Sequence, residues 1–449
     1  MWKQPPDKAT NMTKKRKMMM IVVVVIAYIS SMSNVAGQEY RARNGGPISA
    51  IFVATPNELA RLRSADLSTS ETKPFGPVKD SPLCSPDGAS CIGRPQLVDT
   101  DVQSTILVPL KSKDQSILEC AAVRQGSCRL RNAKTLAEID GGSTPPLVSV
   151  REGDDRSTLV VPLENGRLAV AALPSIGDES PYREGHPFVA VREPPFYQVV
   201  NQGDLDGEAA VFLRADARLS FSKRAKLIEA WTHRHHVYFL AVFPTSSGGA
   251  APAGSSASSG LTTKLVRICA NDTRFASYSE LELQCRDEDN SSGGQVASAA
   301  AVFGDTLAVT FVDAAAETET NNGGGGGGGS STRLCVYNLL KVSQTIWYNA
   351  DRCRAGAGRQ GMPHVGRDAA CTGRASAASA AAASSSSRLD ESQCEVGAGE
   401  PIEQLELAAA RIPGKRASAI AIIPLEEKDS TATTDFVLVL GTTRGRLIW

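Results

Sequence analysis

Short apolar runs separated by tight turns recur along the whole chain. Each unit consists of an apolar run, a turn and a second apolar run, and two of the units have longer connections. The units cover residues 48–62, 105–123, 157–171, 236–270, 299–312 and 435–449. Their turns carry Asn-Gly, Gly-Asp or Arg-Gly pairs, which supply the positive φ angles that β-hairpins need. The pattern therefore predicts an all-β protein.

The spacing of these hairpins favours a β-propeller. The first five begin roughly 50 to 80 residues apart, and recurrence at a period near or above about 40 residues is typical of propeller blades. A β-sandwich or two stacked β domains is the alternative. Helical periodicity is best at 56–67 and 402–412, and both stretches are short.

The stretch 237–243 is apolar without interruption. Alternation of polar and apolar residues is missing there, which indicates a strand that is buried on both faces. Alternate side chains of such a strand pack against different neighbouring sheets. The two expected sets are Val237, Phe239 and Ala241 on one face and Tyr238, Leu240 and Val242 on the other.

Three of the five histidines, His233, His235 and His236, stand directly before this run. On a continuous strand, His233 and His235 would share one face and His236 would take the other. Zinc would need a third ligand and an enclosed pocket, and no residue nearby in the sequence offers itself. We therefore expect the polar entry to a buried strand, with a pH-sensitive rim as its further interest. His186 and His364 stand near glycine and proline and are expected in exposed turns.

Composition excludes several functions. Lys and Arg total 48 and so do Asp and Glu, which gives a formal charge of zero and no general attraction to nucleic acid. Hydrophobic residues make up 42%, enough for a core. No G-x-S-x-G or H-E-x-x-H motif occurs, and no catalytic residue, metal ligand or cofactor is assigned. The acidic stretch 203–208 lacks the spacing of an EF-hand and is expected to be a turn.

Several segments are expected to lie outside the folded β structure. Basic residues at 14–17 precede an apolar run at 18–29, which is typical of a secretory signal peptide over 1–37, with an uncleaved anchor as the alternative. Gly/Ser/Ala-rich runs at 245–260, 321–331 and 374–387 are expected to be loop insertions. The chain is then expected to be extracellular, with its folded region over 38–449.

The ten cysteines fit an oxidising compartment. No C-x-x-C pair occurs, so disulfides are favoured over zinc. The sequons at Asn271 and Asn290 predict N-glycosylation in the same compartment.

Several segments together resemble the extracellular sema domain of the plexin family. The opening of that domain is matched by FGPVKDSPLC (75–84), DTDVQSTILVPL (99–110) and LECAAVRQGSCRL (118–130). Later blades are matched by HVYFLAVF, LVRICANDTRFASYSELELQC, RLCVYNL and LGTTRGRL. The resemblance covers most of residues 48–449 apart from the insertions.

This resemblance implies a seven-bladed sema propeller whose last blade is expected to be incomplete, because the chain ends at Trp449 near the sixth blade's end. It also implies five disulfides, which together use every cysteine. They are Cys84–Cys91, Cys120–Cys128, Cys269–Cys394, Cys285–Cys335 and Cys353–Cys371.

The function implied is ligand recognition without catalysis, as the extracellular module of a plexin-like receptor in signalling of the axon-guidance type. Semaphorin is the implied protein partner. The resemblance also allows a homodimer or a co-receptor, and it implies contact with the membrane only through parts outside this sequence. The alternatives are a secreted semaphorin or a sema protein like the scatter-factor receptors. A metal-dependent propeller hydrolase is the alternative from another class.

Overall fold

The computed structural model describes residues 50–448 with gaps. The longer gaps are 111–115, 140–156, 175–185, 200–209, 246–259, 287–294, 315–331, 372–404, 413–416, 425–435 and 443–446. The expected signal peptide, the acidic stretch 203–208, most of the three insertions, Asn290 and Cys394 therefore lie outside the described residues.

The described strands form six sheets of three to five strands, called sheets 1 to 6 in chain order, and one two-stranded ribbon. The ribbon and the first three sheets are built as follows: sheet 1 from β1 (Ala50–Thr55), β2 (Glu58–Arg63) and β3 (Thr69–Pro74); the ribbon from β4 (Val78–Asp80) and β5 (Val98–Thr100); sheet 2 from β6 (Ser104–Pro109), β7 (Ser116–Ala121) and β8 (Cys128–Asn132); sheet 3 from β9 (Thr158–Pro162), β10 (Leu168–Ala172), β11 (Val189–Glu193), β12 (Gln198–Val199) and β13 (Ala210–Val211).

The later sheets receive strands from further along the chain. Sheet 4 contains β14 (Lys226–His233), β15 (His236–Pro244), β16 (Leu261–Cys269), β17 (Ser279–Arg286) and β21 (Leu405–Ala408); sheet 5 contains β18 (Gln295–Phe303), β19 (Thr306–Asp313), β20 (Thr332–Asn338) and β22 (Ala410–Ile412); sheet 6 contains β23 (Ala417–Pro424), β24 (Phe436–Thr442) and β25 (Leu447–Ile448). Among the described ladders, only β17 with β21 is parallel.

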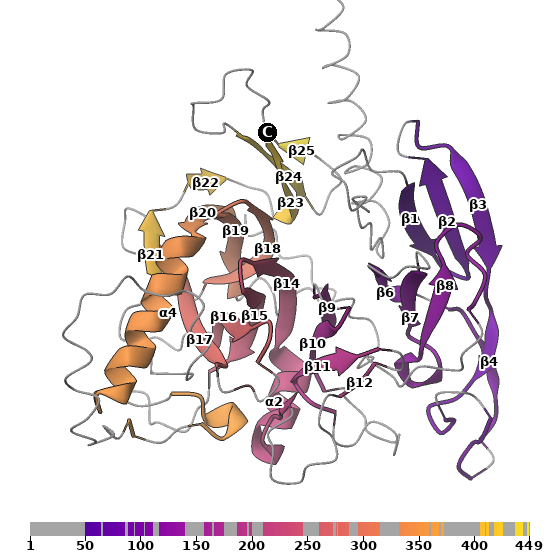
Figure 1. Cartoon of the computed structure of the whole chain (residues 1–449), viewed down its shortest axis with the longest axis horizontal. Helices are drawn as coiled ribbons and strands as arrows, with labels where there is room; N and C mark the ends of the chain where they lie inside the picture. The colour runs from indigo at the N-terminus through magenta and orange to yellow at the C-terminus, as the bar shows by residue number, and fades with distance from the viewer. Residues whose placement is uncertain are drawn as a thin grey trace, which may run out of the picture.

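Successive sheets pack in the manner of propeller blades. The first strand of each sheet contacts the first strand of the next, in the order β1, β6, β9, β14, β18 and β23. Figure 1 shows the sheets following one another in chain order, from indigo through magenta to yellow. Sheets 2 to 5 thus each lie between two neighbouring sheets, which explains why their strands carry apolar runs.

The core confirms the prediction for residues 237–243. Val237, Phe239 and Ala241 pack with sheet 3, whereas Tyr238, Leu240 and Val242 pack with sheet 5. All six side chains are at most 2% exposed. Sheet 4 is therefore a middle layer with two apolar faces.

The two short stretches with helical periodicity are strands, and the first of them is the second strand of the hairpin predicted for 48–62. Residues 58–63 form β2, and 405–412 supply β21 and β22. Among the described residues, the helices are α2 (Ala215–Arg224) and α4 (Leu339–Arg354), and the 3-10 turns are η1 (Arg124–Gly126) and η2 (Pro363–Val365). Helix α4 begins at Asn338, whose side chain accepts hydrogen bonds from the backbone N–H of Leu340 and Lys341.

Candidate functional site

The three clustered histidines do not lie on one strand. β14 ends at His233 and β15 begins at His236, so Arg234 and His235 form the connecting turn, with Arg234 at a φ of 54°. His233 and His236 are directly paired across the hairpin and therefore share a face. The expectation that they would point to opposite faces is wrong because the chain reverses between them.

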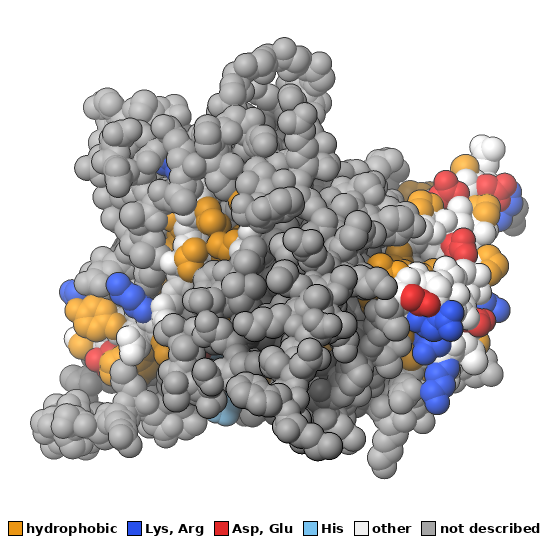
Figure 2. Space-filling view, turned by 90° about the horizontal axis from the view of Figure 1, so that it is seen from above, with side chains coloured by type: hydrophobic (Ala, Val, Ile, Leu, Met, Phe, Trp, Pro, Cys, Tyr) orange, Lys and Arg blue, Asp and Glu red, His pale blue; other side chains and the backbone are white. Residues whose placement is uncertain are grey.

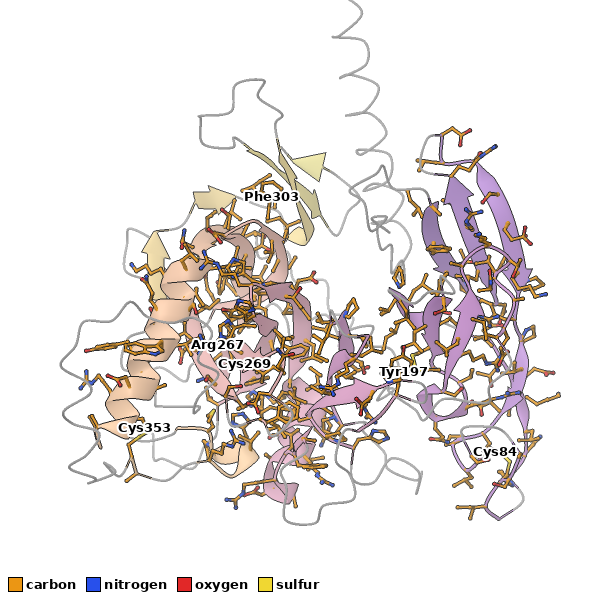
Figure 3. The ribbon with its side chains drawn as sticks, viewed as in Figure 1. Cys84, Tyr197, Arg267, Cys269, Phe303 and Cys353 are labelled. Atoms are coloured by element: carbon orange, nitrogen blue, oxygen red, sulfur yellow. A yellow bond between two sulfur atoms is a disulfide. The ribbon has the colours of Figure 1, made fainter. Side chains whose placement is uncertain are left out.

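This hairpin connects sheet 4 with sheet 5. The His233 Nε2 lies 2.7 Å from a carboxylate oxygen of Asp305, which stands in the β18–β19 turn, and the Asp305 carbonyl accepts from the N–H of Leu339 at the start of α4. Next to it, Arg267 on β16 donates to the Ser343 hydroxyl of α4 at 3.0 Å. Arg267 and Cys269 lie close together in the middle of the fold (Figure 3). Sequence reasoning missed Asp305, since it is 72 residues away in the chain.

Burial keeps His236 neutral. Burial, and then the positive charge of Arg267, lower the pKa of His236 from 6.5 to about 3, with smaller effects of His235 and His233. Burial also lowers the pKa of Arg267. Among the residues that the structure describes, no group of three or more His, Cys, Asp or Glu side chains is arranged to hold a metal ion. What the hairpin does is join two blades.

His364 is not in an exposed turn, so that expectation is wrong, and His186 is half-buried. The His364 ring lies in η2, with Nε2 2.7 Å from a carboxylate oxygen of Glu280, and the side chain of Glu280 is 1% exposed. The same oxygen accepts from the Tyr278 hydroxyl at 2.7 Å. Burial acts to raise the pKa of Glu280, but His364, Lys264 and Tyr278 together hold it below its usual value. The buried carboxylate is thus charged and needs these neighbours.

Disulfides lie both within loops and between neighbouring strands. The described residues contain Cys84–Cys91, Cys120–Cys128, Cys285–Cys335 and Cys353–Cys371. Cys269 is also disulfide-bonded, and its expected pairing with Cys394 stays a prediction because Cys394 lies outside the described part of the chain.

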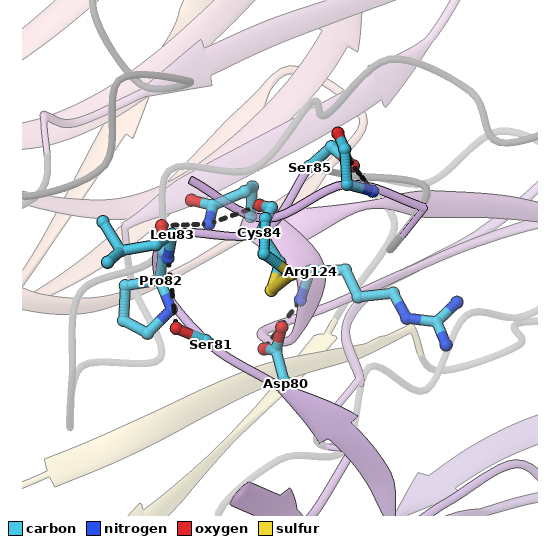
Figure 4. The surroundings of a disulfide bond; sticks show 10 residues. Asp80, Ser81, Pro82, Leu83, Cys84, Ser85 and Arg124 are labelled. Carbon is cyan, nitrogen blue, oxygen red and sulfur yellow. Dashed lines mark hydrogen bonds between the residues drawn. A yellow bond between two sulfur atoms is a disulfide. The ribbon is translucent and has the colours of Figure 1, made fainter. Parts of the chain in front are cut away.

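The Gln-Gly pair between two of these cysteines has a structural role. Gln125 has a φ of 63° and its side-chain amide donates to the carbonyls of Pro82 and Cys84. Next to it, the N–H of Arg124 donates to the Asp80 carboxylate (Figure 4). The η1 turn of sheet 2 therefore holds the loop that follows β4.

Sheet 2 contains a buried ion pair that sequence reasoning did not find. Arg131 on β8 donates to the Glu119 carboxylate on β7 at 3.0 Å, and both side chains are 3% exposed. Ser104 donates to the other Glu119 oxygen, and the Arg131 guanidinium lies 5.4 Å from the centre of the Phe75 ring. The pair stabilises the packing of sheet 2 without access to solvent.

Helix α2 presents exposed apolar side chains on a basic background. Phe212, just before the helix, and Leu219 within it are both exposed. Arg214, Arg218, Lys223 and Arg224 outnumber the single acid Asp216 in this segment. Exposed apolar groups of this kind mark candidate interaction surfaces, and we call residues 212–224 the α2 surface.

Elsewhere in the described part of the chain, the large exposed apolar residues are Ile92, Leu97 and Val98 at or just before β5, Val336 on β20 and Tyr348 on α4. Figure 2 shows acidic and basic side chains interspersed over the end of the molecule that holds the first two sheets. It shows hydrophobic and basic side chains together at the opposite end, where α4 lies. There, Arg352 stacks on the exposed Tyr348 ring at 5.7 Å.

Two further observations concern the cell surface. Asn271 is exposed in the turn after β16, as a glycosylated residue must be. Within the described residues, none of the helices has the length and apolar character required to span a membrane.

Comparison with known proteins gives consistent relatives. Plexin-2 of Caenorhabditis elegans is 36% identical over 388 residues, which cover 86% of this chain and 19% of the relative. Plexin-2 of Caenorhabditis briggsae is 37% identical over 372 residues, or 83% of this chain and 18% of the relative. The chain thus spans about a fifth of the length of these relatives. No family model matches.

Solved structures show the same fold. The extracellular region of plexin A4 superimposes with a TM-score of 0.68 and 19% identity, covering 93% of this chain and 44% of that one. Drosophila semaphorin 2a gives 0.55 and 11%, covering 92% and 64%. Both are sema-type propellers, so the six packed sheets are blades of that fold. With this fold and with plexins as its relatives over most of its length, the chain belongs to the plexin family.

Proposed function

We propose that this chain is an extracellular ligand-recognition module that binds a semaphorin and catalyses no reaction. The observation that carries the proposal is the 36% identity to a plexin over 388 residues. Of the residues that the structure describes, the clustered histidines connect blades, which leaves the hydrolase alternative without a metal site.

The α2 surface is the proposed contact with the ligand. Covering a half-exposed apolar side chain with a partner removes apolar surface from water and stabilises the complex. Basic neighbours favour a partner whose contacting surface is acidic. Phe212 is 46% and Leu219 61% exposed, in a segment that carries three more basic than acidic residues.

The test is binding of the secreted chain to a panel of semaphorin ectodomains, measured by surface plasmon resonance. Phe212→Asp and Leu219→Asp are each expected to weaken binding at least about tenfold, as a central contact does. Matched controls are Tyr348→Asp and Val98→Asp, because Tyr348 is 43% and Val98 59% exposed on other elements. Binding of no semaphorin contradicts the receptor function. Binding that all four variants leave unchanged contradicts only the α2 surface.

We also propose that the chain enters the secretory pathway and is processed there by signal-peptide cleavage, disulfide formation and N-glycosylation. Supporting this are the basic and apolar runs before residue 37, the cysteines that pair in the described region and the exposed Asn271. Mass spectrometry of the secreted protein should find Gln38 as its first residue, a Cys269–Cys394 bridge, glycans on Asn271 and Asn290, and protease cuts within 245–260, 321–331 and 374–387. An N-terminus at Met1 or a free Cys394 thiol would contradict this proposal.

A further inference from the structure

Helix α2 is short and is held mainly by packing. It has ten residues, and no side chain caps its N-terminus at Arg214. Only Phe221 and Ser222 are buried within it. Isolated helices of this length are marginal in water, so the position of α2 depends on the elements against which it packs.

The Phe221 ring of α2 packs on Phe188 and on Phe243 of β15, and a further element, η2, about 150 residues further along the chain, meets α2 at two points. The His364 carbonyl accepts from the N–H of Arg214 at 2.8 Å, at the N-terminal end of α2. The His364 ring stacks on Phe221 with a centroid distance of 5.1 Å and an interplanar angle of 23°. One residue thus contacts both the start of the helix and its buried ring.

The opposite side of η2 is fixed to sheet 4. The His364 imidazole reaches the buried Glu280 carboxylate on β17 and lies 5.4 Å from the Phe243 ring on β15. Arg367 donates to the Phe275 carbonyl and lies over the Tyr278 ring. These contacts leave η2 little freedom to move away from β17.

The η2 loop is also closed on itself. Met362 and Arg367 exchange two backbone hydrogen bonds, of 2.7 and 3.0 Å, and Gly366 adopts a φ of 76° to complete the turn. Met362 is buried in the core between sheets 3 and 4, and the Cys353–Cys371 disulfide ties the loop to the end of α4. The loop is therefore a pre-formed unit that reaches α2 as a rigid body.

We infer that residues 361–367 form a clamp that positions α2, with His364 as its positioning residue, so that the α2 surface meets its ligand already ordered. This inference deepens the proposed function and rests on it for the role of α2 in binding. Ordering before binding removes an entropy cost that the complex would otherwise meet. The clamp itself is a claim about the unbound chain and can be tested without ligand.

The first experiment is hydrogen–deuterium exchange of the intact, secreted chain. His364→Ala is expected to speed exchange of the α2 amides about tenfold, since it removes a hydrogen bond to a charged group and a ring contact. His364→Phe keeps the ring and should recover part of the protection. The matched control is His233→Ala, because His233 also bonds a carboxylate at 2.7 Å and is 11% exposed, against 12% for His364. Equal exchange of α2 in all three variants and the wild type would overturn the clamp.

A second pair of variants avoids the core altogether. Arg214→Pro removes the N–H that donates to His364, and its φ of −60° already suits proline. Arg214→Ala removes the same side chain but keeps that N–H. Exchange of α2 should be faster in the proline variant than in the alanine variant, and identical exchange would again overturn the clamp.

Binding measurements separate the two proposals. Faster exchange with unchanged semaphorin binding supports the clamp and contradicts the α2 surface as the ligand contact. Loss of binding in Leu219→Asp with unchanged exchange in His364→Ala supports the surface and contradicts the clamp. Joint loss of binding and protection in His364→Ala, with both retained in His233→Ala, is the result expected.

Discussion

Mild acid should destabilise the protein through His236, and a single substitution should remove the effect. His236 is 5% exposed at the start of β15, where it pairs with Cys269 of β16. Burial and the facing Arg267 lower its pKa from 6.5 to about 3. The other titratable groups beside it are His233, which bonds Asp305, and the exposed His235.

The sign follows from the direction of the shift. The unfolded chain binds a proton at His236 below about pH 6.5, whereas the folded chain resists it until about pH 3. Protonation of His236 therefore leaves the free energy of unfolding unchanged above pH 6.5 and lowers it as the pH falls from 6.5 towards 3. At pH 5 the separation from 6.5 is 1.5 pH units, which corresponds to about 2 kcal/mol at 1.36 kcal/mol per unit.

Urea unfolding of the oxidised chain at pH 7 and pH 5 measures this difference. The wild type should lose about 2 kcal/mol more between the two pH values than His236→Gln, because glutamine does not titrate. His235→Gln is the control, since its exposed side chain should leave the wild-type pH dependence intact. Equal losses in the wild type and His236→Gln, to within about 0.5 kcal/mol, would refute the assignment of a neutral buried imidazole.

Three other outcomes follow from the described contacts. Glu119→Gln should lower the free energy of unfolding by about 3 kcal/mol, because it leaves Arg131 buried beside a neutral group. In the same urea experiment, Lys79→Gln at an exposed ion pair should lower it by less than about 1 kcal/mol. Asn338→Ala removes the N-terminal cap of α4 and should lower the free energy of unfolding by about 1 kcal/mol. Hydrogen–deuterium exchange checks this, because only the amides in the first turn of α4 should exchange faster. Elemental analysis of the secreted chain should find no stoichiometric zinc; zinc that disappears in His233→Ala would instead support the hydrolase alternative.

Much of the propeller follows from local signals. Hairpins at 48–62, 157–171 and 299–312 were predicted from two apolar runs and a turn, and all three are confirmed as β1–β2, β9–β10 and β18–β19. The prediction for 237–243 went further, because an uninterrupted apolar strand can only be satisfied by a layer on each side. Local pattern therefore predicts which segments are strands and that blades are stacked.

Helical periodicity was a poor guide to the helices, because strand pairing outweighed it. Residues 58–63 have the spacing of a helix, yet they pair with β1 and β3 in sheet 1. Helix α4 carried a usable signal in Asn338 followed by buried Leu339, Val342 and Ile346 at helical spacing. The basic end of α2, Lys223 and Arg224, was a weaker signal of the same kind.

The contacts that hold the site together had no signal in the sequence at all. His233 meets Asp305 across 72 residues and His364 meets Glu280 across 84, and each pair joins elements that only the tertiary packing brings together. The residue types were visible, but a histidine near glycine and proline looks the same whether it ends in solvent or against a buried carboxylate. Both histidines that invited a metal or an exposed turn instead join separate parts of the propeller. His233 links sheet 4 to sheet 5, and His364 links η2 to sheet 4 and to α2, so both side chains take part in the packing of the fold.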